Sequence, residues 1–120
     1  MIADDDAGIV DLLSIMLETE GYEVSSTLNG NSLLDIHSDL PDIILMDISM
    51  AGVDGLEVCR KLREKELTHQ IPIVMVSGSD DMEPSVLDAG ANDFLAKPFD
   101  LHELLEKIEK NLPTETGGRT

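Results

Sequence analysis

Short runs of consecutive apolar residues constrain the fold of this chain more than any other feature. Residues 43–46 are IILM, residues 73–76 are IVMV, and residues 94–96 form a third, shorter run. Runs without polar alternation are typical of strands covered on both faces, as in a parallel sheet. The three runs therefore predict the central part of a parallel sheet.

Segments with helical spacing separate these runs. In residues 9–17 the apolar side chains recur at i, i+3, i+4, i+7 and i+8, which indicates one face of a helix. A β-prone stretch at residues 23–27 follows it. The other segments expected to be helical are 33–36 (ended by Pro41), 56–62, 82–89 and 101–112. The alternation predicts an α/β fold, with helices on both faces of a doubly wound, five-stranded parallel sheet.

The first strand fits this pattern least well. Only residues 1–3 precede a run of three aspartates, where four or five residues would be comfortable for a strand. Either this strand is short, or residues upstream of it are missing from the chain.

Size and charge narrow the range of functions. The chain has 120 residues, which fits one domain, and 8 basic against 25 acidic side chains give a net charge of -17. Direct binding to nucleic acid or to an anionic membrane is disfavoured, because both need clustered Lys and Arg. The lone Cys59, the lack of a long apolar run and the acidic start lead us to expect a soluble, cytoplasmic protein.

Chemically active side chains follow the predicted strands. Asp4, Asp5 and Asp6 come after the first strand. Asp47, Ser77 and Lys97 come after the third, fourth and fifth strands, respectively. Because functional groups collect beyond the carboxyl ends of strands in open parallel sheets, we expect these side chains at one rim.

Clustered carboxylates repel one another, and a hard cation such as Mg²⁺ relieves that repulsion. Lys97 and Ser77 add a positive charge and a hydroxyl donor for phosphate oxygens. A carboxylate in such surroundings is equipped to attack phosphorus and form an aspartyl phosphate. Asp4, Asp5 and Asp47 therefore form a candidate Mg²⁺ site, whereas Asp6 is expected only to begin a helix.

With these residues in view, the chain resembles the CheY-like receiver domain of two-component response regulators. The spacing is 43 residues from Asp4 to Asp47, 30 to Ser77 and 20 to Lys97. The resemblance covers residues 1–112, with 113–120 expected to be a linker or disordered tail. The motifs that carry it are DDD at 4–6, ILMD at 44–47, MAGVDG at 50–55, VSG at 76–78 and GANDFLAKPF at 90–99.

The resemblance implies a flavodoxin-like sheet of order 2-1-3-4-5 with five helices. It implies that Asp47 is the phosphoacceptor for a histidine kinase or histidine phosphotransfer protein, and that the domain is not an enzyme in the usual sense. Asp5 would bind Mg²⁺ directly and Asp4 mostly through water. The remaining implied roles are a metal ligand at the Ser49 carbonyl, a switch at Ser77 and Phe94, phosphate binding by Ser77 and Lys97, and support from Gly78 and Pro98, the latter a candidate cis proline.

Three departures from the family pattern are visible, and the short first strand described above is one of them. Ala51 stands where the family often has proline, so we expect a looser turn, and Phe94 replaces the commoner tyrosine. Two other functions stay open. A Mg²⁺-dependent phosphatase or phosphotransferase would want a second aspartate at the position of Ser49, and a phosphate-independent binding module would usually have lost one of the key residues.

The other notable residues have ordinary structural readings. Cys59 is expected in the core, the three histidines have no ligand spacing, and the basic residues 60–65 are expected on a solvated helix face, with a partner contact as the alternative. The last helix lacks arginine, so we expect a monomer or a weak, phosphorylation-dependent dimer. The switch is expected to control an effector domain or a partner protein.

Overall fold

The structure, a computed structural model, describes residues 1–50 and 52–112. Its main sheet has five strands in the order β2-β1-β3-β6-β7, and every pair of neighbours is parallel. In chain order this is the expected 2-1-3-4-5 arrangement of the main strands, so the predicted topology is confirmed. The strands are β1 (Ile2–Ala3), β2 (Ser26–Thr27), β3 (Ile44–Asp47), β6 (Ile73–Ser77) and β7 (Asp93–Ala96).

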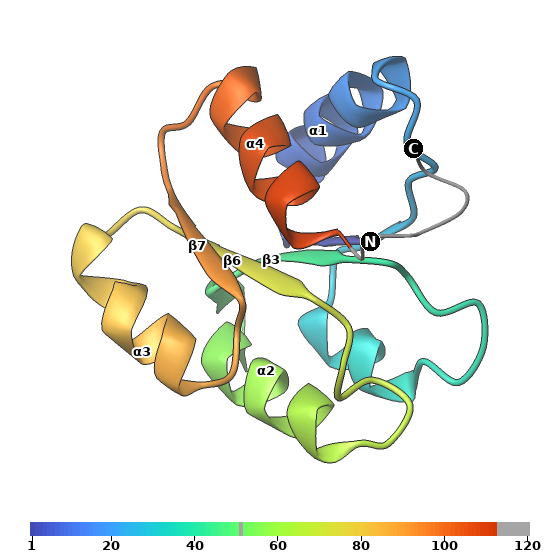
Figure 1. Cartoon of the computed structure of the whole chain (residues 1–120), viewed down its shortest axis with the longest axis vertical. Coiled ribbons are helices and arrows are strands. Elements are labelled where there is room, and N and C mark those ends of the chain that lie inside the picture. The colour runs from blue at the N-terminus through green and yellow to red at the C-terminus, as the bar shows by residue number, and fades with distance from the viewer. Residues whose placement is uncertain (51, 113–120) are drawn as a thin grey trace.

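Helices cover both faces of this sheet, as expected. Figure 1 shows α1 and α4 on one face and α2 and α3, with the turn of helix that follows β2, on the other. The 3-10 segments are η1 (Gly30–Asp35) and η2 (Asp80–Met82). The α-helices are α1 (Ala7–Thr19), α2 (Gly55–Glu64), α3 (Glu83–Asp88) and α4 (Leu101–Asn111).

The continuous apolar runs serve two cores. In β3, Ile44 and Met46 pack toward α2 and α3, whereas Leu45 packs toward α1 and α4. In β6, Met75 packs toward α2 and α3, whereas Val74 packs toward α1 and α4. Successive strand residues point to opposite faces, so a strand covered on both sides needs apolar residues at every position.

Acidic N-caps fix where three helices begin. The Asp6 carboxylate accepts hydrogen bonds from the N–H groups of Gly8 (2.9 Å) and Ile9 (3.2 Å), which confirms it as a helix-start residue. Asp54 caps α2 through the Leu56 N–H at 3.0 Å. Asp100 forms a capping box with Glu103 at the start of α4. Each cap satisfies N–H groups that lack partners within the helix, typically stabilising it by about 1 kcal/mol.

The second expected helix is only a 3-10 segment, η1. Leu33 of this segment is fully buried, but the chain becomes extended at Ile36 and adopts a φ of 50° at Asp39. Leu33 is the one large apolar side chain of η1 that is fully buried, and Leu34 packs against the core only partly buried. This apolar packing is too small to support a longer helix, since short helices depend on tertiary contacts for stability. The expected second strand is also shorter, covering only the last two residues of 23–27.

A small hairpin that was not predicted follows β3. It pairs β4 (Ser49–Met50) with β5 (Val53–Asp54) in antiparallel fashion, and Gly52 in its turn has a φ of 70°. A two-residue pairing falls below what alternation of side chains can reveal. The expectation of a looser turn at Ala51 concerns a position outside the described residues.

Strand β1, which lies between β2 and β3 in the sheet, is as short as the sequence suggested. The Met1 ammonium lies in line with this strand and donates to the Ile43 carbonyl at 3.1 Å. Burial lowers the pKa of this ammonium, and the negative charge of Asp42 raises it by a smaller amount. A cavity of about 660 Å³ adjoins it, lined by residues that include Ile2, Val24, Ile43, Val74, Ile108 and Leu112.

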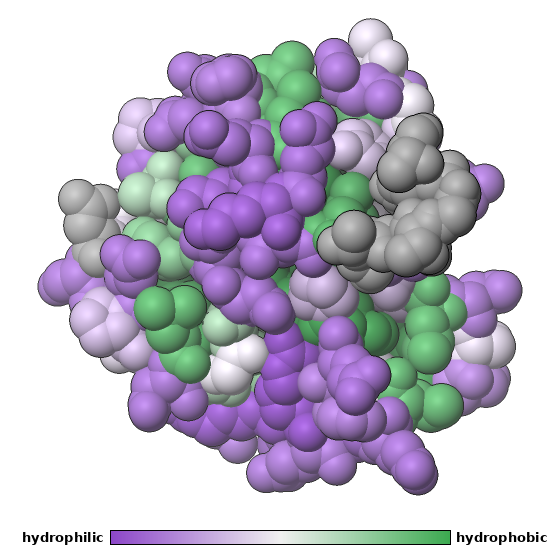
Figure 2. Space-filling model, in the orientation of Figure 1, coloured by the Kyte–Doolittle hydropathy of each residue, from purple (hydrophilic) through white to green (hydrophobic). Residues whose placement is uncertain are grey.

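The surface of the face in Figure 2 is largely hydrophilic over α4 and partly hydrophobic over α3, where Leu87 is exposed. Among the described helices, none has the length and apolar character needed to cross a membrane.

The basic stretch of α2, expected to be a solvated helix face, differs from that expectation at Arg63, which is half-buried. Its guanidinium donates to the carbonyls of Gly90 and Ile71 and to Asn92 Oδ1, each at 2.7 Å.

Candidate functional site

The strand order brings the predicted site residues to one rim. Asp4 directly follows β1, Asp47 ends the adjacent β3, Ser77 ends β6 and Lys97 directly follows β7. Asp4, Asp47 and Ser77 are all buried, at 5%, 8% and 8% exposure, and Asp5 is exposed. The rim therefore combines two buried acids with one that faces solvent.

Three carboxylates meet at this rim. Asp4, Asp5 and Asp47 each offer an oxygen that lies within 4.8 Å of the other two. Burial raises the pKa of the Asp4 carboxyl above its ordinary value, and the nearby charges of Asp47 and Asp5 also raise it. The Asp6 N–H, 2.9 Å from Asp4 Oδ1, and the Lys97 ammonium act in the opposite direction. Repulsion among these groups makes the rim attractive to a cation.

Lys97 supplies the positive charge at the rim. Its Nζ lies 3.1 Å from Asp47 Oδ2 and 4.0 Å from Asp4 Oδ2. The Lys97 N–H donates to the Ser77 carbonyl at 2.8 Å, and the Lys97–Pro98 peptide bond is cis, as the sequence suggested for Pro98. The side chain is 31% exposed, so its ammonium contacts both the acids and solvent.

Ser77 is held at the start of the next loop. Its Oγ accepts a hydrogen bond from the Ser79 N–H at 3.1 Å, which leaves the hydroxyl proton available for another acceptor. Asp47 pairs in register with Val76, so Ser77 lies one position farther along the neighbouring strand. Among the described residues, apart from Gly78 and its two chain neighbours, no atom lies within 4 Å of the place where a side chain at Gly78 would begin.

The other two predicted residues, Phe94 and Ser49, lie in β7 and β4. Phe94 in β7 is 7% exposed and packs into the core beneath α2 and α3. Ser49 is in the hairpin after Asp47, and its N–H donates to Asp47 Oδ1 at 3.3 Å. The backbone of this hairpin therefore contacts the candidate phosphoacceptor directly.

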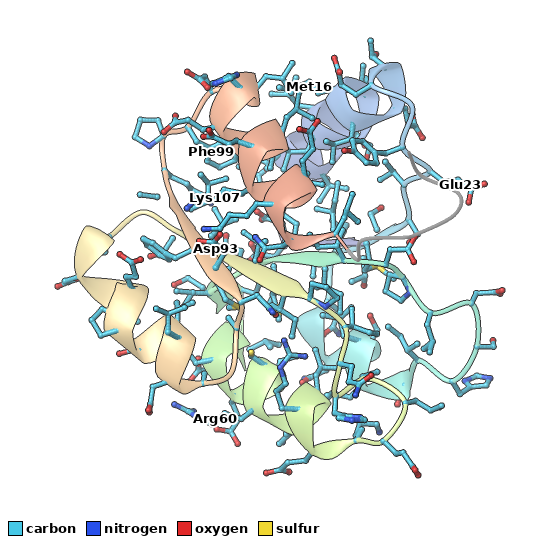
Figure 3. The ribbon with its side chains drawn as sticks, viewed as in Figure 1. Met16, Glu23, Arg60, Asp93, Phe99 and Lys107 are labelled. Carbon is cyan, nitrogen blue, oxygen red and sulfur yellow. The ribbon has the colours of Figure 1, made fainter. Side chains whose placement is uncertain are left out.

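Sequence reasoning missed a third buried acid, Asp93, which is 7% exposed. Lys107 Nζ (2.9 Å), Asn111 Nδ2 (3.0 Å) and Lys110 Nζ (3.4 Å) all contact its carboxylate. Burial raises the pKa of Asp93, but these hydrogen bonds and that of the Phe94 N–H outweigh it and hold the pKa at about 2. Figure 3 shows Lys107 reaching from α4 toward Asp93. The i, i+3 spacing of the two lysines was the available signal.

Comparison with known proteins gives a consistent result. Residues 1–109 match the model of the response regulator receiver domain. A CheY-like response regulator receiver domain protein from Methanospirillum hungatei is 33% identical, with a TM-score of 0.81 and coverage of 91% of this chain and 88% of that chain. The receiver domain of NtrX from Brucella abortus is 29% identical, with a TM-score of 0.84 and coverage of 95% and 98%.

A third similar structure is the response regulator TrrA from Thermotoga maritima in complex with Mg²⁺-BeF. It is 31% identical, with a TM-score of 0.81 and coverage of 91% of this chain and 94% of that chain. The fold, the acidic rim and these matches show that the chain belongs to the response regulator receiver domain family. It is thus a domain of two-component signalling, and its family consists of phosphoacceptors rather than conventional enzymes.

Proposed function

We propose that Asp47 is the phosphoacceptor of this receiver domain. The observation that carries the proposal is the position of its buried carboxylate, which lies beside the ammonium of Lys97 and within 4.8 Å of oxygens of Asp4 and Asp5. A carboxylate at the end of a strand, with a cation-attracting cluster on one side and a lysine on the other, is suited to accept a group that brings negative charge.

The donor set at this rim fits Mg²⁺, which prefers carboxylate oxygens and water. Asp5 and Asp47 would bind the ion directly with the Ser49 carbonyl, and Asp4 would act mostly through water. The raised pKa of buried Asp4 supports this assignment, because an added positive charge would remove the cost of ionising it. When bound, Mg²⁺ supplies neutralisation of the charge that develops on the phosphoryl oxygens.

The phosphoryl group would come from a phosphohistidine of a histidine kinase or a histidine phosphotransfer protein. One Asp47 oxygen attacks phosphorus, a P–O bond forms, and the P–N bond to histidine breaks. The electron pair of the P–N bond stays on the imidazole nitrogen, which then takes up a proton. Lys97, now 3.1 Å from Asp47 Oδ2, would pair with the phosphoryl oxygens instead.

Ser77 and Phe94 would convert phosphorylation into a conformational change. Ser77 Oγ can keep the Ser79 N–H as donor while giving its own proton to a phosphoryl oxygen. A shift of Ser77 toward the phosphoryl group would open a space into which the buried Phe94 side chain can move. Reversing a 1:99 population would take about 5.5 kcal/mol of differential interaction, and a partner selective for one state needs less.

The proposal extends to the organisation of the chain. Residues 1–112 would act as the receiver unit and 113–120 as a linker or tail leading to an effector. The partners would be a histidine kinase or phosphotransfer protein and an effector domain or protein. The domain itself would be a monomer or a weak, phosphorylation-dependent dimer that does not bind nucleic acid or membranes directly.

Intact mass after incubation with Mg²⁺ and acetyl phosphate tests the assignment. The wild type and the exposed-acid control Asp11→Asn should gain one phosphoryl group, whereas Asp47→Asn should gain none. Equal gain by Asp47→Asn would refute it. If partner binding were the same for the wild type and for Asp47→Glu and Asp47→Asn, a phosphate-independent module would be supported instead.

A phosphatase acting on small phosphate esters is less consistent with the site. That reaction needs a general acid two positions after the nucleophile. Ser49 occupies this position, and its N–H donates a hydrogen bond to Asp47. Multiple turnover on a phosphate ester would restore this alternative.

A further inference from the structure

Two glycines lie at opposite ends of the hairpin that follows Asp47. Gly55 begins α2 behind the base of the hairpin, and Gly30 begins η1 beside the hairpin residues Met50 and Val53. Both glycines are buried, and neither has the positive φ that would by itself call for glycine. The reason for glycine at both positions is therefore the space that a side chain would occupy.

Gly55 lies against the backbone of the candidate phosphoacceptor. A Cβ placed on Gly55 would be 2.5 Å from the Asp47 carbonyl oxygen and 2.9 Å from Cα and the carbonyl oxygen of Ile48. These are backbone atoms, so no side-chain rotation can relieve the overlap. The Gly55 N–H also donates to the Ile48 carbonyl at 2.8 Å, which joins the start of α2 to the residue that follows β3.

Gly30 makes room at the other end. A Cβ there would be 2.5 Å from Met50 Cε, 3.1 Å from Met50 Sδ and 3.2 Å from Val53 Cγ1. Met50 is only 5% exposed, and its side chain joins the core beneath the hairpin. The hairpin is thus packed closely at both ends, although its own pairing involves only two residues on each side.

We propose that Gly55 and Gly30 are positioning residues, which hold the segment from Asp47 to Met50 where its carboxylate and the Ser49 carbonyl can bind a cation together. This inference rests on the proposed function, because it assigns the metal and phosphoacceptor roles to that segment. The Ser49 N–H, 3.3 Å from Asp47 Oδ1, shows that the two groups already share one local conformation. A displacement of the Asp47 backbone would move both groups relative to Asp4 and Asp5.

The primary test is the affinity for Mg²⁺ alone, measured by titration of the amide resonances of the rim residues. Gly55→Ala should weaken Mg²⁺ binding about tenfold or more and slow phosphorylation by acetyl phosphate to a similar extent, because small misplacements at a reacting group are costly. Gly8→Ala is the matched control, since a Cβ there meets only a side-chain oxygen of Asp6 at 3.3 Å. It should bind Mg²⁺ like the wild type.

Loss of stability must be separated from loss of positioning. Ile108→Val changes the core on the α1 and α4 side of the sheet, which does not include the hairpin residue Met50. We expect it to lower stability and to leave Asp47 in place. It should leave Mg²⁺ affinity unchanged in the folded protein. If Gly55→Ala binds Mg²⁺ within about twofold of Ile108→Val and wild type, the positioning role of Gly55 is wrong.

Gly30→Ala provides the test that does not depend on Gly55→Ala folding. The added methyl group overlaps mainly with the flexible end of the Met50 side chain. We therefore expect a smaller loss of Mg²⁺ affinity than in Gly55→Ala, about threefold. Adding Met50→Ala removes the overlapping Cε and Sδ atoms and should restore affinity toward that of Met50→Ala alone. Failure of this rescue, or no loss in Gly30→Ala, overturns the role of Gly30. The wild type serves as the reference in every series. If it neither binds Mg²⁺ nor gains a phosphoryl group, the proposed function itself has failed.

Discussion

Lys97 Nζ lies 3.1 Å from Asp47 Oδ2, although the two residues are 50 positions apart in the chain. The contact joins the ends of β3 and β7, which are separated in the sheet by β6. The same ammonium is 4.0 Å from Asp4 Oδ2. One lysine thus offsets part of the repulsion between two buried acids.

We expect Lys97→Met to destabilise the protein in the presence of EDTA. Removing the ammonium leaves Asp4 and Asp47 without their positive neighbour, and the partly exposed position suggests a cost of about 0.5–1 kcal/mol. Mg²⁺ should recover more stability in Lys97→Met than in the wild type. Urea unfolding with and without Mg²⁺ measures both effects, and equal Mg²⁺ stabilisation of the two proteins would contradict this account.

Asp4→Asn should stabilise the protein in EDTA, whereas Lys97→Met should destabilise it. Because the pKa of folded Asp4 is raised, its contribution to stability is fully present at low pH and is lost as the pH rises through that pKa. At neutral pH its charge therefore opposes folding, and Asp4→Asn should raise the melting temperature in EDTA. The variant should also gain less from added Mg²⁺ than the wild type. A lower melting temperature in EDTA would count against this view of the rim.

Asp93 should govern part of the acid stability. Its pKa is lowered to about 2 from an ordinary 3.8, so its stabilisation is present above the ordinary value and is lost as the pH falls toward 2. Asp93→Asn should cost on the order of 1–2 kcal/mol at neutral pH. The difference from wild type should shrink as the pH falls through that window. Free energies of unfolding of the wild type and Asp93→Asn, measured between pH 7 and pH 2, test this prediction, and the substitution Asp88→Asn at an exposed acid is the control. A difference between wild type and Asp93→Asn that stays constant with pH would contradict it.

Ser77→Ala should separate phosphorylation from switching. The three rim acids Asp4, Asp5 and Asp47 are untouched, so intact mass should still show a phosphoryl group after acetyl phosphate treatment. The variant lacks the hydroxyl that would contact the phosphoryl group, so the amide resonances near Phe94 should shift much less than in the wild type. Full shifts at Phe94 without this hydroxyl would exclude Ser77 from the switch.

Apolar residues added before Met1 should stabilise the fold. They would replace a buried ammonium with an amide and would extend β1 into the cavity beside Ile43. An extension of about four alternating Ile and Val residues should raise the melting temperature by roughly 4–8 °C. A Ser-Gly extension of the same length is the control, because it removes the charge without filling the cavity. Equal melting temperatures for the two extensions would show that the cavity does not accept a strand.

Several features follow from local sequence because they depend on local physical chemistry. Continuous apolar runs need cover on both faces, which predicts the strands around Leu45 and Val74 and the layers of helices. Aspartate before an amphipathic segment predicts the N-cap at Asp6. Motifs at fixed spacing predict the group of Asp4, Asp5, Asp47 and Lys97, since parallel strands end at the same rim.

Other features could not be predicted in this way. The hairpin after Asp47 contains too few residues to show a periodic pattern. The segment η1 is short because Leu33 is its one fully buried large apolar side chain. Arg63 belongs to a basic run, yet it is half-buried because backbone carbonyls from distant loops converge on it.

The sequence by itself thus determined the order of strands and helices and the set of charged groups at their ends. Only the tertiary structure decided which groups touch, including Lys97 with Asp47, the two lysines of α4 with Asp93, and Gly55 with the Asp47 backbone. The reason is physical. Periodicity and capping act over one turn or one strand, whereas ion pairs and close backbone approaches depend on distances between elements, which are set when the sheet and its helices pack together.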